Sequence, residues 1–201
     1  MEQIVERKKD MIQWIQPYIE EHFSDSCRMI QEELEAHGDM IWNELRGIMC
    51  EILTRVERLQ KQHIKSGVKY FVFSLLNCSI YLGKIELRID ALDDSFYLDE
   101  QEVAGYYYPQ FLQDKYWKGL ERLYQKVTEK FVRIQNYELQ DINVVYAQYY
   151  SSIMFRMLES LGSLIMKTII ESGVSIAEDL KILYGQYMDK AAVVYKGYER
   201  Q

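Results

Sequence analysis

The sequence has few of the residues that break helices and few that carry local chemistry. Only two of its 201 residues are proline, Pro17 and Pro109, so long helices can run without interruption. Its cysteines, Cys27, Cys50 and Cys78, are odd in number and form no CxxC pair. We therefore expect buried, reduced thiols rather than disulfides or a metal site.

Local signatures of nucleotide binding and nucleophilic catalysis are also missing. No Gly-x-Gly-x-x-Gly, Walker loop or Gly-x-Ser-x-Gly occurs. Glu33 and His37 are spaced i,i+4 as metal ligands can be, but the Glu-x-x-His pairs of a bundle di-iron site are absent. We predict no cofactor, no metal ligand and no catalytic residue. We lean towards a protein that is not an enzyme, while a catalytic group assembled in space stays open.

An excess of positive charge and a long uncharged apolar run are lacking as well. The formal net charge is −7, which argues against nucleic acid or an anionic membrane as the partner. Residues 1–10 contain no apolar signal-peptide core, and Arg156, Glu159 and Lys167 interrupt the most apolar stretch. A helix-turn-helix at Gly173 is disfavoured, because Ile169 stands where a small residue is needed. We therefore expect a cytoplasmic protein with no nucleic-acid or membrane partner.

What the sequence does have is helical periodicity, strongest between Asp141 and Gly173. Asp141 is a suitable N-cap, and Gly173 suits the position just beyond a helix C-terminus. Apolar residues occupy most of the circumference of this predicted helix, so neighbours must cover it on several sides. The sequence predicts a mainly α fold, an irregular helical bundle around this long apolar central helix, in a single domain over residues 1–201.

Further helices are expected on both sides of the central one. Towards the N-terminus we predict a helix over 2–23 that Pro17 kinks or splits in two, a turn at 24–26 and a second helical piece up to about 37. A helix from 39 to about 65 follows. Helices over 110–134 and 175–197 complete the predicted bundle.

The predicted helix over 39–65 carries apolar residues at heptad spacing. They are Trp42, Leu45, Met49, Ile52, Val56, Leu59 and His63. This seam suits core packing within one chain, which we favour, or a coiled-coil dimer. A homodimer is also expected on general grounds, because twofold dimers are the commonest oligomers.

One short antiparallel β-hairpin is predicted at about 84–99, as an insertion that makes the fold α+β in the broad sense. Ile85, Leu87 and Ile89 alternate with charged residues, which is the period of a half-buried strand, and the segment 96–98 can return beside them. The preceding segment 68–82 fits either a helix or a strand, and we favour the helix.

Acidic and aromatic residues coincide in and after this hairpin. They are Asp90, Asp93, Asp94, Asp99, Glu100, Tyr106, Tyr107 and Tyr108. Because aromatic residues are enriched at interfaces and carboxylates complement Lys and Arg, these residues are the predicted partner-binding site. The predicted function is a non-enzymatic protein–protein interaction module, an acidic adaptor, inhibitor or immunity-type protein whose partner has a basic surface.

Two alternatives to this function remain. One is a small-molecule-binding or enzymatic helical domain with a pocket near the hairpin, bordered by Arg88, Asp90 and the three tyrosines. The other is a solvated hairpin whose tyrosines pack inward and bind nothing.

Overall fold

The computed structural model describes residues 2–196, with side chains from residue 6 onward, and these residues pack into two compact units. Unit 1 contains residues up to 37, residues 78–85 and residues 109–153. Unit 2 contains residues 38–77 and 86–108 and those from 154 onward. None of the described helices combines the length and the apolarity that a bilayer span requires.

Helix α1 (Glu2–Lys61) contributes to both units. Within it His37 has non-helical backbone angles, φ −131° and ψ 18°, and this residue is the last one of α1 that belongs to unit 1. The helix continues through Pro17 and through the predicted turn at 24–26, so that turn was a wrong prediction. Ser26 is instead a buried helical residue that hydrogen-bonds with the hydroxyls of Tyr146 and Tyr150, which satisfies its polar group.

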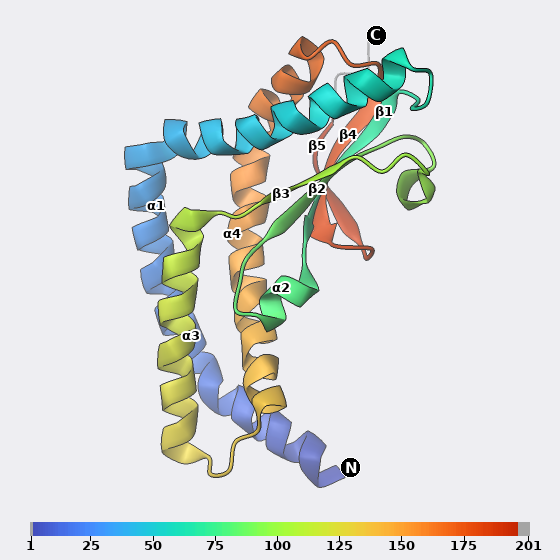
Figure 1. The fold of residues 1–201 in the computed structure, drawn as a ribbon. Coiled ribbons are helices and arrows are strands. Elements are labelled where there is room, and N and C mark those ends of the chain that lie inside the picture. The colour runs from blue at the N-terminus through green and yellow to red at the C-terminus, as the bar shows by residue number, and fades with distance from the viewer. Residues whose placement is uncertain (1, 197–201) are drawn as a thin grey trace. The chain divides into compact units, whose positions relative to one another are not determined.

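Unit 1 is helical (Figure 1). The first part of α1 packs with α3 (Gln110–Lys130) and with the first part of α4 (Asn136–Glu171). The short helix α2 (Asn77–Tyr81) leads into the segment 82–85, which Gln113 fixes. The Gln113 side chain accepts a hydrogen bond from the Ile85 amide at 3.0 Å and donates one to the Gly83 carbonyl at 2.8 Å.

Unit 2 contains a five-stranded mixed sheet in the order β3-β2-β1-β4-β5 (Figure 1). Its strands are β1 (Val68–Leu75), β2 (Leu87–Leu92), β3 (Ala104–Tyr107), β4 (Ile176–Gln186) and β5 (Ala191–Lys196). Strands β1 and β4 are parallel, and the other neighbouring pairs are antiparallel. The predicted bundle with one short hairpin is therefore wrong, although an α+β class fits.

Three segments account for this error. The segment 68–82, predicted as a helix, forms β1 and then α2. The predicted last helix over 175–197 forms β4 and β5 as far as Lys196, and Gly197 lies outside the described residues. The predicted return strand is only a 3-10 turn, η1 (Phe96–Leu98), and β2 pairs with β3 instead.

The strand β4 was mistaken for a helix because it is buried on both faces around its middle. Its residues Leu180, Ile182, Leu183 and Tyr184 are all buried. A strand covered on both faces reads as a continuous apolar run rather than an alternation, and a run of this kind also fits a helical stripe.

One face of the sheet is covered by helices of unit 2. Phe71, Phe73 and Ile89 lie on this face and are completely buried. Helix α1 lies against β3, because a methyl group at Gly105 would come within 2.9 Å of Ile52. Helix α4 lies against β4, where the ring of Phe155 is 6.1 Å from the ring of Tyr184.

The heptad residues of α1 belong to this core. Leu45, Met49, Ile52 and Val56 are completely buried within the chain. Packing inside one chain, the favoured interpretation of the seam, therefore accounts for their burial without a second copy.

Candidate functional site

The other face of the sheet carries tyrosines grouped around Arg88. Arg88 and Asp90 are two residues apart on β2, and Arg88 pairs in register with Tyr106 on β3, so their side chains project from the same face. Tyr187, which follows β4, and Tyr97, in η1, make ring contacts above it. We call these five residues the tyrosine face.

Arg88 is held in place by carboxylates. Its Nε donates to both carboxylate oxygens of Asp90 at 3.0 Å, and its Nη2 donates to Asp90 at 2.9 Å and also to Glu102. Asp90 is only 2% exposed, so this pair is almost withdrawn from water. The hydrogen bonds that Arg88 donates to Asp90 raise the pKa of Arg88, although burial acts in the opposite direction. The guanidinium thus has a structural role, and most of its N–H donors are already used in hydrogen bonds.

The same guanidinium orders the tyrosines. It lies 4.9 Å from the ring centroid of Tyr187 and 5.9 Å from that of Tyr106, and Nη1 donates to the Tyr106 hydroxyl at 3.4 Å. Tyr97 meets Tyr187 edge-on at 5.9 Å. Cation–π contacts contribute about 0.5–1 kcal/mol each at exposed sites. Arg88 therefore restricts the rotation of the Tyr106 and Tyr187 rings, which would otherwise be free in water.

The three consecutive tyrosines do not form one surface. Tyr106 is 54% exposed and Tyr108 is 38% exposed, whereas Tyr107 is 1% exposed because strand alternation turns it to the helix-covered face. Burial and the nearby charge of Glu44 raise the pKa of Tyr107. Its hydroxyl has no hydrogen-bond partner among the described residues. Tyr107 is therefore a core residue. The alternative of a solvated hairpin expected this inward packing of all three tyrosines.

Burial also divides the predicted acidic residues. Asp99 forms an ion pair with Lys65 in which the two side chains are 2% and 0% exposed. The Lys65 ammonium donates to the Gln101 carbonyl at 2.9 Å, and Asp99 accepts from the amides of Asp93 and Gln101 at 3.1 Å and 2.9 Å. Asp99 thus shapes the loop between β2 and β3 instead of facing a partner.

Asp93 supports the same loop. It accepts hydrogen bonds from the Ser66 hydroxyl and the Ser95 amide, both at 2.8 Å. Burial acts to raise the pKa of Asp93, but these hydrogen bonds and the charge of Lys65 outweigh it, and the pKa is lowered. Of the predicted acidic residues, only Asp94 and Glu100 remain exposed.

Four exposed residues of β3 and of the loop between β2 and β3 are together called the acidic rim. It consists of Asp94, Glu100, Glu102 and Tyr106. Two apolar side chains in unit 2 are also strongly exposed, Leu98 in η1 at 83% and Met188 next to Tyr187 at 64%. Sequence reasoning did not select Tyr97, Leu98, Tyr187 or Met188. Tyr187 and Met188 had no usable signal, because the β4–β5 turn lay inside a predicted helix.

Comparison of the chain with protein-family models, with curated proteins and with solved structures gives no match.

Proposed function

We propose that this protein acts by binding another protein through the acidic rim. The observation that supports the proposal is the half-exposed ring of Tyr106, whose orientation is fixed by Arg88, the same residue that contacts the exposed carboxylate of Glu102. An aromatic side chain ordered before binding loses little conformational entropy when a partner covers it. Tyrosine is also among the residues that contribute most at interfaces.

The chemistry of the rim selects a partner with a basic surface. Asp94 and Glu100 form no ion pair with a described residue, so their charges stay available to Lys or Arg of a partner. Glu102 is 62% exposed although it contacts Arg88. Charges at the rim of an interface mainly raise the association rate, so binding should weaken as salt increases. An acidic adaptor, inhibitor or immunity-type role remains the proposed class.

A catalytic pocket at Arg88 and Asp90 is the weaker proposal. A substrate anion would have to displace Asp90, Glu102 or Tyr106 from the guanidinium, because these groups already occupy its donors. Removing Asp90 from the pair would leave a nearly buried carboxylate without its partner, which is strongly destabilising.

Capture from the source cell tests the proposal with a charge-matched control. The test variant is Asp94→Lys/Glu100→Lys/Tyr106→Ala. The control is Glu6→Lys/Glu21→Lys/Tyr137→Ala, which changes the net charge equally and truncates a tyrosine that is 50% exposed in unit 1. All of these side chains are exposed, so both variants should keep the wild-type circular dichroism spectrum.

We expect the wild-type protein and the control variant to retain the same basic partner, with retention falling as salt rises. The test variant should lose it. Equal retention by both variants, or retention that salt does not affect, would remove the acidic rim as the binding surface.

A further inference from the structure

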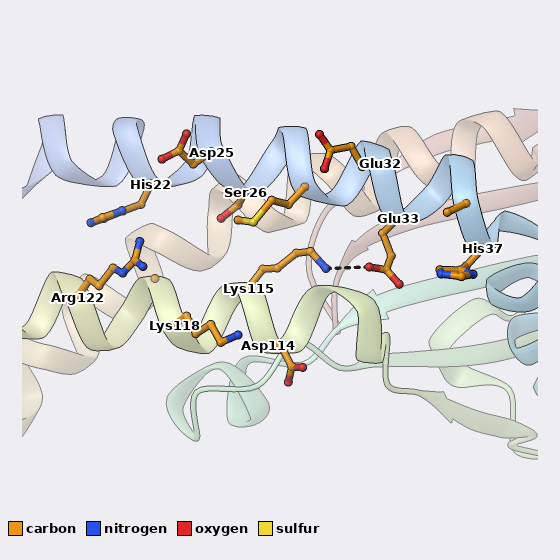
Figure 2. Close-up of a pocket in the computed structure, with 13 residues that line it drawn as sticks. His22, Asp25, Ser26, Glu32, Glu33, His37, Asp114, Lys115, Lys118 and Arg122 are labelled. Carbon is orange, nitrogen blue, oxygen red and sulfur yellow. Dashed lines mark hydrogen bonds and ion pairs between the residues drawn. The ribbon is translucent and has the colours of Figure 1, made fainter.

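A polar groove runs between α1 and α3 within unit 1 (Figure 2). Its volume is about 600 Å³, in the range of small-molecule sites. One wall is α1 from His22 to His37, and the other is α3 from Asp114 to Arg122. The predicted function does not use this groove, and the acidic rim belongs to unit 2.

Side chains of both charges line the groove. Figure 2 shows Arg122 of α3 directed towards His22 of α1, and Lys115 directed towards Glu33. Asp25, Glu32 and Asp114 also line the groove, although Figure 2 shows their carboxylates directed away from Arg122 and Lys115.

The two cations inside the groove differ in their partners. Lys115 is paired with Glu33 at 3.5 Å and donates to the Phe111 carbonyl at 2.9 Å. Arg122, in contrast, forms no ion pair with any residue that the structure describes. Burial is the largest cause that lowers the pKa of His22, and the charge of Arg122 acts in the same direction, whereas Glu21 and Asp25 act to raise it. One end of the groove thus holds an exposed guanidinium without an ion-pair partner among the described residues.

The hydroxyl groups near this end of the groove are buried. Ser26 lines the groove although it is only 4% exposed, and it hydrogen-bonds with Tyr146 and Tyr150. Tyr146 is completely buried beneath Gly119, where a methyl group would lie 2.1 Å from its hydroxyl oxygen. Glycine is required here because any side chain would displace that hydroxyl. These hydroxyls are occupied with one another, so Arg122 and His22 are the groups left to meet a ligand at this end.

We propose that this end of the groove binds the oxyanion of a small molecule, a phosphate or a carboxylate, between Arg122 and His22. The guanidinium supplies a planar pair of donors that matches either oxyanion. The imidazole of His22, on the opposite wall, supplies a second donor. The remaining length of the groove, as far as Lys115 and Glu33, accommodates the rest of the molecule.

The three histidines of the chain allow a test with internal controls. His22 lies at the proposed site, His37 lies at the far end of the groove, and His63 lies in unit 2. Imidazole proton resonances of the full chain would be followed during titration with sodium phosphate, and separately with sodium acetate, at constant pH and ionic strength. The variants His37→Gln and His63→Gln assign the signals.

We expect saturable displacement of the His22 signal towards its protonated position, because a bound anion favours the imidazolium. The His63 signal should not move. Arg122→Gln should weaken binding by about tenfold or more, since a charge-assisted hydrogen bond is lost. Arg133→Gln, which removes an exposed arginine elsewhere in unit 1, should leave it unchanged.

Saturation by phosphate alone or by acetate alone would support the site and assign it to that class of ligand. The proposal is overturned if neither probe saturates the His22 signal, if His22 and His63 shift in parallel, or if Arg122→Gln binds as the Arg133→Gln protein does. Circular dichroism of both variants verifies that the comparison is made between folded proteins.

Discussion

Buried tyrosine hydroxyls give unit 1 a polar core. The rings of Tyr116 and Tyr146 stack at 5.4 Å, and Tyr150 meets them edge-on at 4.9 Å and 5.2 Å. Tyr116 donates to Asn143, and the hydroxyls of Tyr146 and Tyr150 are 3.3 Å apart. Because each hydroxyl has a partner, these rings add apolar burial without leaving an unsatisfied donor.

Alkaline pH should unfold the protein through these residues. Burial is the main cause that raises the pKa of Tyr116, Tyr146 and Tyr150, whereas an unfolded tyrosine ionises near pH 10. Above about pH 10 the unfolded chain therefore binds fewer protons than the folded chain, and the free energy of unfolding falls as pH rises. Tyrosinate absorbance should appear in two phases, the second coinciding with loss of circular dichroism. Complete ionisation with the helices intact would contradict this assignment.

Tyr107, in unit 2, differs from the buried tyrosines of unit 1, because its hydroxyl has no hydrogen-bond partner among the described residues. An unsatisfied buried hydroxyl costs about 1–3 kcal/mol, so Tyr107→Phe should raise the free energy of unfolding by about 1 kcal/mol. Denaturant titration measures the change, with Tyr106→Phe as an exposed neighbour that should be nearly neutral. Destabilisation by Tyr107→Phe would mean that the hydroxyl is hydrogen-bonded after all.

At the scale of elements, the loop between β2 and β3 depends on one ion pair. Lys65, which follows α1, and Asp99 are both buried, and Asp99 also accepts two backbone amides of the loop. Removing the carboxylate leaves a buried ammonium without its counter-charge, which is far more costly than losing a surface pair.

Asp99→Asn should therefore destabilise the protein by about 3–5 kcal/mol. The exposed neighbouring substitution Asp94→Asn should change stability by less than about 0.5 kcal/mol. Equilibrium unfolding in urea compares the two. The double variant Lys65→Met/Asp99→Leu should recover much of the loss, because it removes both charges together. Equal stability of the Asp99→Asn and Asp94→Asn variants would disprove the structural role of the pair.

The sequence was informative wherever an element follows its own local period. The segment 110–130 and the apolar region around Tyr146 carry strong helical periods, and both are helices. Leu87 and Ile89 alternate with charged residues, and both lie in β2. Strands β1 and β4 lack such a signal, because each pairs with a strand on either side and is buried on both faces.

The candidate site was predictable only in part, for the same reason. The grouping of Asp90 with Arg88 and Tyr106 follows from the β2–β3 pairing, which local sequence does not reveal because the return strand lies beyond η1. The parallel pairing of Phe71 with Ile182 joins segments from distant parts of the chain, and it brings Tyr187 to the tyrosine face. Burial of Tyr107 and Asp99 depends on these same contacts.

For the whole molecule, the net charge of −7 does not translate directly into binding charge. Asp90 and Asp99 are neutralised inside unit 2 by Arg88 and Lys65, so they help to build the fold. Asp94 and Glu100 remain exposed. Steering of a basic partner would therefore come from the acidic rim together with the general field of an acidic protein.

Site-specific photo-cross-linking at Tyr106 tests the proposed function most directly. A photoreactive phenylalanine analogue would replace Tyr106 in the living source cell, and in a parallel strain it would replace Tyr137, which is 50% exposed in unit 1. We expect one predominant cross-linked protein with a basic surface at position 106, and we expect it to be lost when Asp94 and Glu100 are changed to lysine. No cross-linked protein at position 106, or the same products at both positions, would contradict the proposal that this surface binds a partner.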